Sequence, residues 1–365
     1  MSLNPIRPRA LRASLFLFMC GLSACARTAP LESVMNNPLL GDPRSWCIGR
    51  FVIDRPVHSE LSAEEYKYWG DKIDFTGHIS PGTFQHKVNA RENELRTKKR
   101  TTSVSYKEMQ TKGLKSMIVE TDIPWLEKAV SPTPNSRLLI YKDDGDSADS
   151  LLDEEGYVLA GTTMLTMKSL LRPVDIQQSI ERTTDVYRNI TYRDNWTVPA
   201  ERGFCINGAL IGGPPRNSEA AEQTIVLLPG RPSAFVIDMR VAVDGYRQSS
   251  LLKTLPDLRQ ELRAQGYSHN VHILREAKRQ VAGMDAEEVL FSIKEGGVQL
   301  FRFYLLAPGA PKTVTQPHTD IQLILGATND STLTPEQASS PVDEAGAIQI
   351  WDTLLGSMRL RPGAL

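Results

Sequence analysis

The sequence predicts an α+β fold of two similar tandem domains, each a mainly antiparallel sheet packed with helices. Segments with strand character follow one another across short turns, and helical segments are few. The two halves begin alike, because residues 46–49 are Trp-Cys-Ile-Gly and residues 203–208 are Gly-Phe-Cys-Ile-Asn-Gly. Both halves also close with an amphipathic helix. Together these observations indicate a divergent tandem duplication.

The first half is expected to contain more strands than helices. Strands are expected, in order, at 46–53, 72–75, 116–120, 137–142 and 156–167, and the first of them opens this half. Segment 82–99 is highly charged but places Phe84, Val88 and Leu95 on roughly one face, which favours a helix. A second helix is expected at 174–190, where Pro173 suits the first turn and apolar residues recur at helical spacing.

The second half repeats this order of elements. Strands are expected at 224–228, 234–243, 271–279, 288–294, 298–306 and 320–326. The sequence Glu-Gly-Gly at 295–297 is typical of a hairpin turn between two of them. A helix is expected at 250–264 and another at 341–358. The last one has apolar residues at i, i+3, i+4 and i+7, namely Trp351, Leu354, Leu355 and Met358.

The first 25 residues have the layout of a secretory signal. Three arginines precede an apolar run at 13–22, and the small residues Ser23 and Ala24 stand directly before Cys25. The run has about ten residues, whereas a membrane-spanning helix needs about 20, so a spanning helix is disfavoured. The alternatives are an ordinary cleaved signal with an incidental cysteine and a lipoprotein signal.

Small residues followed by cysteine resemble the lipobox of bacterial lipoproteins, in which the cysteine is acylated and becomes the new N-terminus. The resemblance implies a signal peptide at 1–24 and a lipid on Cys25. The segment that follows is rich in Pro and small polar residues, which predicts a tether at 25–44. The resemblance also implies a periplasmic protein with a lipid anchor in the membrane. Ala26, where the family would carry Asp for inner-membrane retention, favours the outer membrane.

Chain length and charge limit the number of domains and the classes of partner. Without the first 24 residues, 341 remain, enough for two domains, expected at 45–197 and 198–362. The full chain has 42 Lys and Arg against 43 Asp and Glu, a net charge of −1. The leader carries three of the arginines, which leaves −4 on the rest. Nucleic-acid binding normally requires a basic excess, so no nucleic-acid partner is expected.

Two cysteines are left after the leader and the lipid site are assigned. Cys47 and Cys205 are an even pair in an oxidising compartment, which favours a disulfide. Two buried free thiols are the alternative, since cysteine is often a small core residue.

The sequence contains no convincing catalytic or metal-binding motif. It has no Gly-x-Ser-x-Gly, no His-Glu-x-x-His and no Cys-x-x-Cys. The glycine-rich segment 212–215 includes two prolines, which lack the amide donors of a phosphate cradle. We therefore expect no enzyme, no metal and no cofactor.

An aromatic cluster is the one candidate interaction site that the residues offer. Tyr66, Tyr68 and Trp69 lie among charged residues and next to Gly70. Tyrosine and tryptophan are enriched at interface anchors, so these three are candidate partner contacts. The alternative is that they pack beneath the loops of the first domain.

Four segments carry a resemblance to a known family. They are Trp46-Cys47-x-Gly49-Arg50-Phe51 with Asp54-x-Pro56, Gly203-Phe204-Cys205, the acidic strand 283–290, and the ending 350–362 with Trp-Asp and Ser-x-Arg-Leu-Arg-Pro. They resemble segments of the periplasmic immunity proteins that neutralise the fourth family of type VI secretion lipase effectors. Asp285-Ala286 interrupts what is often a Gly-Glu-Glu string in that family.

The resemblance implies a function and a mechanism. Members of the group use two domains to grip a phospholipase effector beside its active-site entrance, which blocks lid opening and substrate access. By this resemblance the chain forms a two-lobed clamp and inhibits a cognate phospholipase effector in the periplasm. An alternative of another class is an envelope-maintenance lipoprotein that binds lipid or cell-wall fragments, and a hydrolase with an unfamiliar site is a third.

Overall fold

The computed structural model describes residues 37–143, 151–241, 250–328 and 332–365. The expected leader, the lipid site Cys25 and most of the expected tether lie outside these residues. Within the described ranges, no helix is long and apolar enough to cross a membrane.

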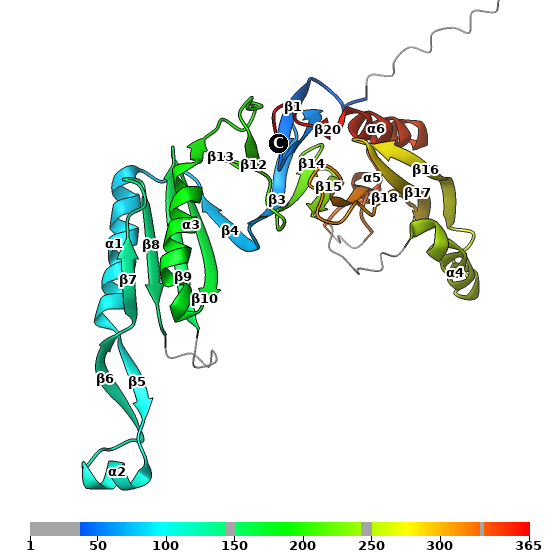
Figure 1. Ribbon diagram of the computed structural model, residues 1–365. Coiled ribbons are helices and arrows are strands. Elements are labelled where there is room, and N and C mark those ends of the chain that lie inside the picture. Colours follow the sequence, from blue (N-terminus) through cyan, green and yellow to red (C-terminus); the bar gives the residue numbers. More distant parts are fainter. Residues whose placement is uncertain (1–36, 144–150, 242–249, 329–331) are drawn as a thin grey trace, which may run out of the picture. The chain divides into compact units, whose positions relative to one another are not determined.

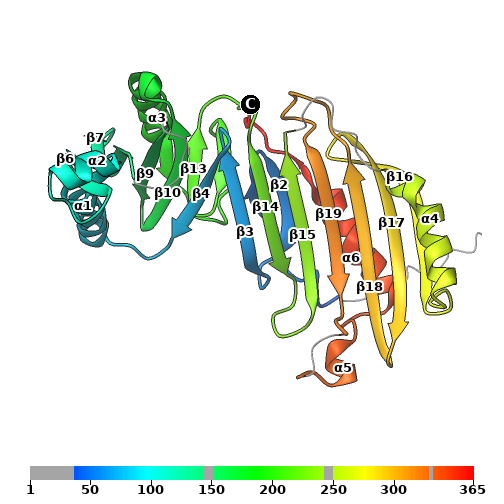
Figure 2. The same ribbon diagram turned by 90° about the horizontal axis from the view of Figure 1, so that it is seen from below.

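The main feature of the fold is one antiparallel sheet of twelve strands (Figures 1 and 2). Six strands come from the C-terminal half, in the order β16 (Val271–Val281), β17 (Met284–Glu295), β18 (Val298–Ala307), β19 (His318–Leu325), β15 (Ser233–Arg240) and β14 (Ala220–Val226). The sheet continues through six strands of the N-terminal half, in the order β3 (Glu60–Tyr68), β4 (Asp71–Thr76), β10 (Thr163–Leu171), β9 (Leu152–Ala160), β8 (Ser136–Tyr141) and β7 (Leu126–Val130). The predicted fold class, mainly antiparallel strands with few helices, is confirmed.

The two halves share this sheet through a direct strand pair. β14 pairs with β3, and the register sets Ala221 opposite Tyr66. No strand is expected at 60–68 from the sequence, since most of that segment is polar and its two aromatic residues come only at the end. The sequence therefore does not predict that the sheets of the two halves join edge to edge.

Three small sheets complete the strands. β1 (Pro43–Ile48), β2 (Phe51–Pro56) and β20 (Arg359–Leu360) form one, so the C-terminal tail pairs with the start of the first half. β11 (Ile190–Tyr192), β13 (Ala209–Gly212) and β12 (Gly203–Ile206) form another. The third is a hairpin of β5 (Lys99–Ser103) and β6 (Ile118–Pro124), with α2 (Tyr106–Thr111) at its end (Figure 1).

The longer helices form where the sequence predicts them. α1 (Pro81–Thr97) begins with Ser80 as N-cap and buries Phe84, Val88 and Leu95, the predicted face. α3 (Ile176–Arg188) follows a short 3₁₀ turn, η1 (Pro173–Asp175). α4 (Leu251–Ala264), α5 (Pro335–Ala338) and α6 (Glu344–Ser357) belong to the second half.

Two predicted strands are wrong. The segment 46–53 is not a single strand but the end of β1 and the start of β2, paired across a tight turn in which Ile48 lies opposite Phe51. The segment 156–167 is not a single strand but the end of β9 and the start of β10, paired across a hairpin in which Thr163 lies opposite Ala160. Gly161 adopts a φ of +60°, which suits a tight turn and which glycine adopts without strain. The flanking apolar residues hide this turn in the sequence.

The largest hydrophobic cluster lies on the face of the sheet that α6 covers (Figure 2). Trp351 of α6 is completely buried and makes edge contacts with Phe235 and Phe303, at ring-centroid distances of 6.3 and 5.8 Å. The same cluster includes Trp46 and Tyr66 of the first half. A continuous core therefore accompanies the continuous sheet.

Candidate interaction site

The two cysteines lie together where the halves meet. The structure joins Cys47 of β1 to Cys205 of β12 in a disulfide, with an S–S distance of 2.04 Å across 158 positions of sequence. Gly49 and Cys205 also exchange two backbone hydrogen bonds of 3.0 and 2.7 Å. The opening segments of both halves, which look alike in sequence, are thus bonded to each other.

A buried ion pair reinforces this junction. Arg50 and Glu219 are 2% and 5% exposed, and the guanidinium donates to both carboxylate oxygens, over 2.7 and 2.6 Å. Arg50 also donates to the backbone oxygen of Ala364 in the tail. Such a bidentate ion pair is among the stronger hydrogen-bonded contacts of proteins and fixes the relative orientation of the two side chains.

The C-terminal tail is held by a second buried arginine. Arg361 donates to the backbone oxygens of Pro199, Glu201 and Gly203 over 2.6 to 2.7 Å. Burial and the nearby charge of Arg50 lower the pKa of Arg361. These carbonyls open the second half, and the tail also pairs with β2 of the first half through β20, so the tail fixes the connection between the halves.

A third buried cluster lies between β16, β17 and α6. The carboxylate of Glu288 is 2.8 Å from Arg275 and 2.9 Å from Arg279, and it accepts a 2.8 Å hydrogen bond from the Trp351 indole. Asp352 pairs with the same two arginines. Glu288, Trp351 and Asp352 all lie in segments that carry the family resemblance, so these segments hold the fold together.

Two of the three aromatic candidates are core residues. Tyr66 and Tyr68 are 1% and 3% exposed, because they alternate with Lys67 along β3 and share its inner face. The Tyr66 hydroxyl accepts a hydrogen bond from Gln223 over 2.6 Å, and burial raises its pKa. The two tyrosines therefore have almost no surface left for a partner. Their interpretation as partner contacts gives way to the alternative, that they pack in the core.

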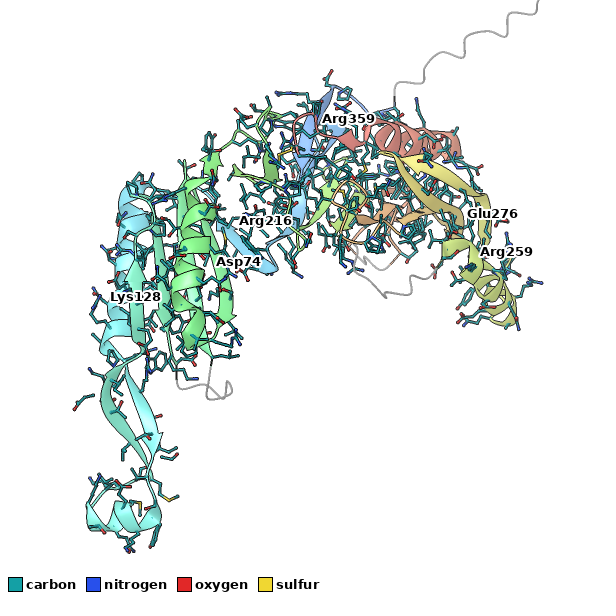
Figure 3. All side chains as sticks on the ribbon, viewed as in Figure 1. Asp74, Lys128, Arg216, Arg259, Glu276 and Arg359 are labelled. Atoms are coloured by element: carbon teal, nitrogen blue, oxygen red, sulfur yellow. A yellow bond between two sulfur atoms is a disulfide. The ribbon has the colours of Figure 1, made fainter. Side chains whose placement is uncertain are left out.

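Trp69, the third candidate, is 38% exposed. It forms the two-residue turn between β3 and β4 together with Gly70, and its φ is +60°, a region that tryptophan rarely adopts. The Cζ atoms of Arg216 (Figure 3) and Arg182 lie 4.2 and 5.3 Å from the Trp69 ring centroid, within cation–π range. A strained aromatic residue held between two cations suits a functional site.

A concave surface of about 480 Å³ adjoins Trp69. We call it the Trp69 surface, and its lining residues are Trp69, Leu151, Leu170, Leu171, Arg172, Asp175, Gln178, Ser179 and Arg182. Leu170 is 59% exposed, which is unusual for a large apolar side chain beside a hollow. An exposed tryptophan and arginines around a depression are typical of a protein-binding hot spot.

Acidic groups also lie near Trp69. Asp71 shares a small notch with Trp69, Arg182 and the buried Glu154. Burial raises the pKa of Asp71 to about 6, and Glu154 contributes to the rise while Arg182 opposes it. Glu154 accepts a 2.8 Å hydrogen bond from Thr183 and another from Ser179.

The sequence points to Trp69 but not to its neighbours. Arg182 comes from α3, Leu170 from the end of β10, and Arg216 from the connection between β13 and β14. Only the sheet topology brings these distant segments to one turn. In the part of the chain that the structure describes, no group of three or more His, Cys, Asp or Glu residues could hold a metal ion.

Comparison with known proteins identifies the family. Residues 44–193 match the N-terminal domain of Tle cognate immunity protein 4, and residues 197–363 match its C-terminal domain. A comparison with curated proteins finds no match.

Solved structures share the fold. The apo structure of the immunity protein TplEi of the type VI secretion system from Pseudomonas aeruginosa superposes with a TM-score of 0.71 at 21% identity. It covers 88% of this chain and 98% of its own. The crystal structure of the Tle4-Tli4 complex gives a TM-score of 0.72 at 22% identity with the same coverage.

The two family matches together span nearly all of the described residues and show the relationship directly. This chain belongs to the Tle cognate immunity protein 4 family and carries both its N-terminal and its C-terminal domain.

Proposed function

We propose that this protein binds a cognate phospholipase effector of a type VI secretion system in the periplasm and inhibits it without catalysis. The two domains clamp the effector beside its active-site entrance, so that the lid cannot open and substrate cannot enter. The observation that carries the proposal is the presence of both immunity domains in order along one chain.

The rigid junction between the domains supports a clamp. Binding costs free energy for every group that must be ordered in the complex, so a surface fixed beforehand binds more tightly. The Cys47–Cys205 disulfide, the Arg50–Glu219 pair and the Arg361 contacts fix the connection before any partner arrives. Inhibition by such a surface needs no catalytic group.

The leader supports the periplasmic location. We propose that Cys25 is acylated and anchors the protein to the outer membrane. Several acyl chains make such anchoring stable, whereas one is marginal. An inhibitor at the membrane stands where a phospholipase meets its substrate. A Cys25→Ser protein should leave the membrane fraction, and its retention there would contradict the anchor.

The Trp69 surface is our candidate for a contact with the effector. It combines an exposed tryptophan and two arginines around a hollow, as protein-binding hot spots do.

The proposal predicts a phospholipase gene next to the gene for this protein, and the product of that gene is the enzyme with which inhibition is tested. Periplasmic expression of that enzyme should stop growth, and co-expression of this protein should restore it. The purified protein should abolish hydrolysis of micellar phospholipid and of a monomeric short-chain ester at one equivalent, because both lid movement and substrate entry are blocked. An unrelated phospholipase should keep its activity. If the neighbouring enzyme keeps its rate on both substrates, the proposal is wrong.

A further inference from the structure

The sheet of the second half has one face that is only partly covered by a helix. Along β18, Phe301 and Phe303 face α6 and are buried, while Arg302 and Tyr304 alternate with them on the opposite face. Val289 and Phe291 of β17 lie on that opposite face too, where Leu255 of α4 packs against them (Figure 2).

A groove lies between α4 and β18 on this face. Its volume is about 390 Å³, within the usual range of small-molecule sites, about 300–1,000 Å³. It is lined by Leu251, Thr254, Leu255, Leu258, Leu262, Val271, Val289, Phe291, Ile293, Arg302 and Tyr304. The leucines follow one face of α4 and make an apolar wall along the helix.

The groove has a single charged lining residue. Arg302 donates to the backbone oxygens of Phe301, Leu325 and Gly326 over 2.8 to 2.9 Å. A guanidinium has five N–H donors, so two remain after these three bonds. No carboxylate of the described ranges pairs with Arg302, and burial lowers its pKa.

A second polar group stands beside this cation. The Tyr304 ring makes an edge contact with Phe291 at 6.1 Å, and its hydroxyl forms no hydrogen bond with any residue that the structure describes. Among the described residues, the apolar groove is thus lined by a cation without a carboxylate partner and by a hydroxyl without a hydrogen bond. Such a groove is complementary to an amphiphilic anion with one long chain.

We propose that this groove binds a free long-chain fatty carboxylate. The acyl chain lies along Leu251, Leu255, Leu258 and Leu262, and the carboxylate accepts hydrogen bonds from Arg302 and from the Tyr304 hydroxyl. The site is separate from the Trp69 surface, since the two share no lining residue. The proposal does not depend on the proposed function, although a phospholipase would release ligands of this class.

The test is isothermal titration of the purified protein with laurate below its micelle concentration. Saturable binding of one laurate is expected, and affinity should rise about tenfold for each two methylenes from octanoate to laurate, because each buried methylene adds to the apolar contact. Methyl laurate, which lacks the charge, should bind at least about tenfold more weakly. Dodecyltrimethylammonium, which carries the opposite charge, should bind most weakly.

Substitutions of lining residues test whether laurate binds in the groove. Arg302→Met and Leu258→Glu should each weaken laurate binding about tenfold or more, since one removes the cation and the other places a carboxylate beside the chain. Lys253→Met is the matched control, because Lys253 is an exposed cation of α4 outside the groove lining.

If Arg302→Met fails to fold, Leu258→Glu and Tyr304→Phe decide, because Leu258 is 39% exposed and the Tyr304 hydroxyl has no hydrogen-bond partner among the described residues. Absence of saturable laurate binding overturns the proposal. Laurate binding that neither Leu258→Glu nor Tyr304→Phe changes also overturns the proposal. Inhibition of the effector should persist in Leu258→Glu, which separates failure of this proposal from failure of the immunity function.

Discussion

Trp69 shows how a single residue can be costly for folding and useful for binding. A tryptophan in left-handed backbone costs about 1–2 kcal/mol, and two cation–π contacts recover roughly that amount. A position at which the residue type brings no net stability is where a binding role is to be sought.

Trp69→Asn is the direct test of this residue. Asparagine before Gly70 suits the turn, so the free energy of unfolding should change by no more than about 1 kcal/mol. Effector binding should weaken at least about tenfold, as for an interface anchor. Thermal unfolding and titration with the effector measure the two effects. Tyr267→Asn, which removes another half-exposed aromatic residue, is the control and should leave affinity intact. Unchanged affinity in Trp69→Asn would remove Trp69 from the interface.

Asp71 makes stability depend on pH in a specific direction. Its pKa rises from 3.8 to about 6 on folding, so the native state holds the proton more tightly than the unfolded chain does. The contribution of Asp71 to stability therefore falls as pH rises from about 4 to about 6. Asp71→Asn should be more stable than the parent at pH 7.5, by about 1 kcal/mol after allowance for solvent screening, and equal to it near pH 4. Urea unfolding at both pH values checks this, with the exposed Asp74→Asn on the same strand as control (Figure 3). A gain that is the same at both pH values would contradict the assignment.

At the scale of elements, the disulfide between β1 and β12 and the strand pair β3–β14 connect the halves. The sequence gives the cysteine-bearing openings directly, because the pattern of aromatic residue, Cys, Ile and Gly occurs twice. It does not predict the pairing of β3 with β14, because the sequence of a strand does not specify which distant strand will pair with it. The helices are predicted best, since periodic burial on one face is visible locally, as Phe84, Val88 and Leu95 in α1 show.

The disulfide between β1 and β12 should contribute strongly to stability. It closes a loop of 158 positions, which restricts the unfolded chain by about 5 kcal/mol on the loop-entropy model. Cys47→Ala with Cys205→Ala should lower the free energy of unfolding by an amount of that order. Denaturant unfolding of the oxidised protein, the reduced protein and the double variant is the measurement. A double variant as stable as the oxidised parent would refute this account.

On the scale of the whole molecule, the C-terminal tail secures the connection between the halves. Arg361 is 1% exposed and satisfies three carbonyls at the start of the second half, whereas Arg359, two residues earlier, forms an exposed pair with Asp54. Losing hydrogen bonds from a buried charge costs far more than losing an exposed ion pair.

Arg361→Met and Arg359→Met form a matched pair of variants. The first should lower the free energy of unfolding by about 3 kcal/mol or more, since three carbonyls lose a charged donor. The second should cost less than about 1 kcal/mol. Denaturant unfolding of both compares them directly, and equal losses would show that the tail does not hold the connection. Arg361→Met should also weaken effector binding, because the domains are no longer fixed relative to each other before binding.

The sequence by itself determined the mainly antiparallel α+β character, the faces of the long helices, the repeated cysteine openings and the family. Each of these is local, since it depends on spacing or residue type within one segment. Only the tertiary structure decided that the sheets of the two halves join at β3–β14 and that Tyr66 and Tyr68 belong to the core. It alone placed Arg182 and Arg216 beside Trp69 and placed Arg302 in an apolar groove, without a carboxylate partner among the described residues. Those features depend on which distant segments become neighbours, and periodicity along the chain reports that a face is buried but not what buries it.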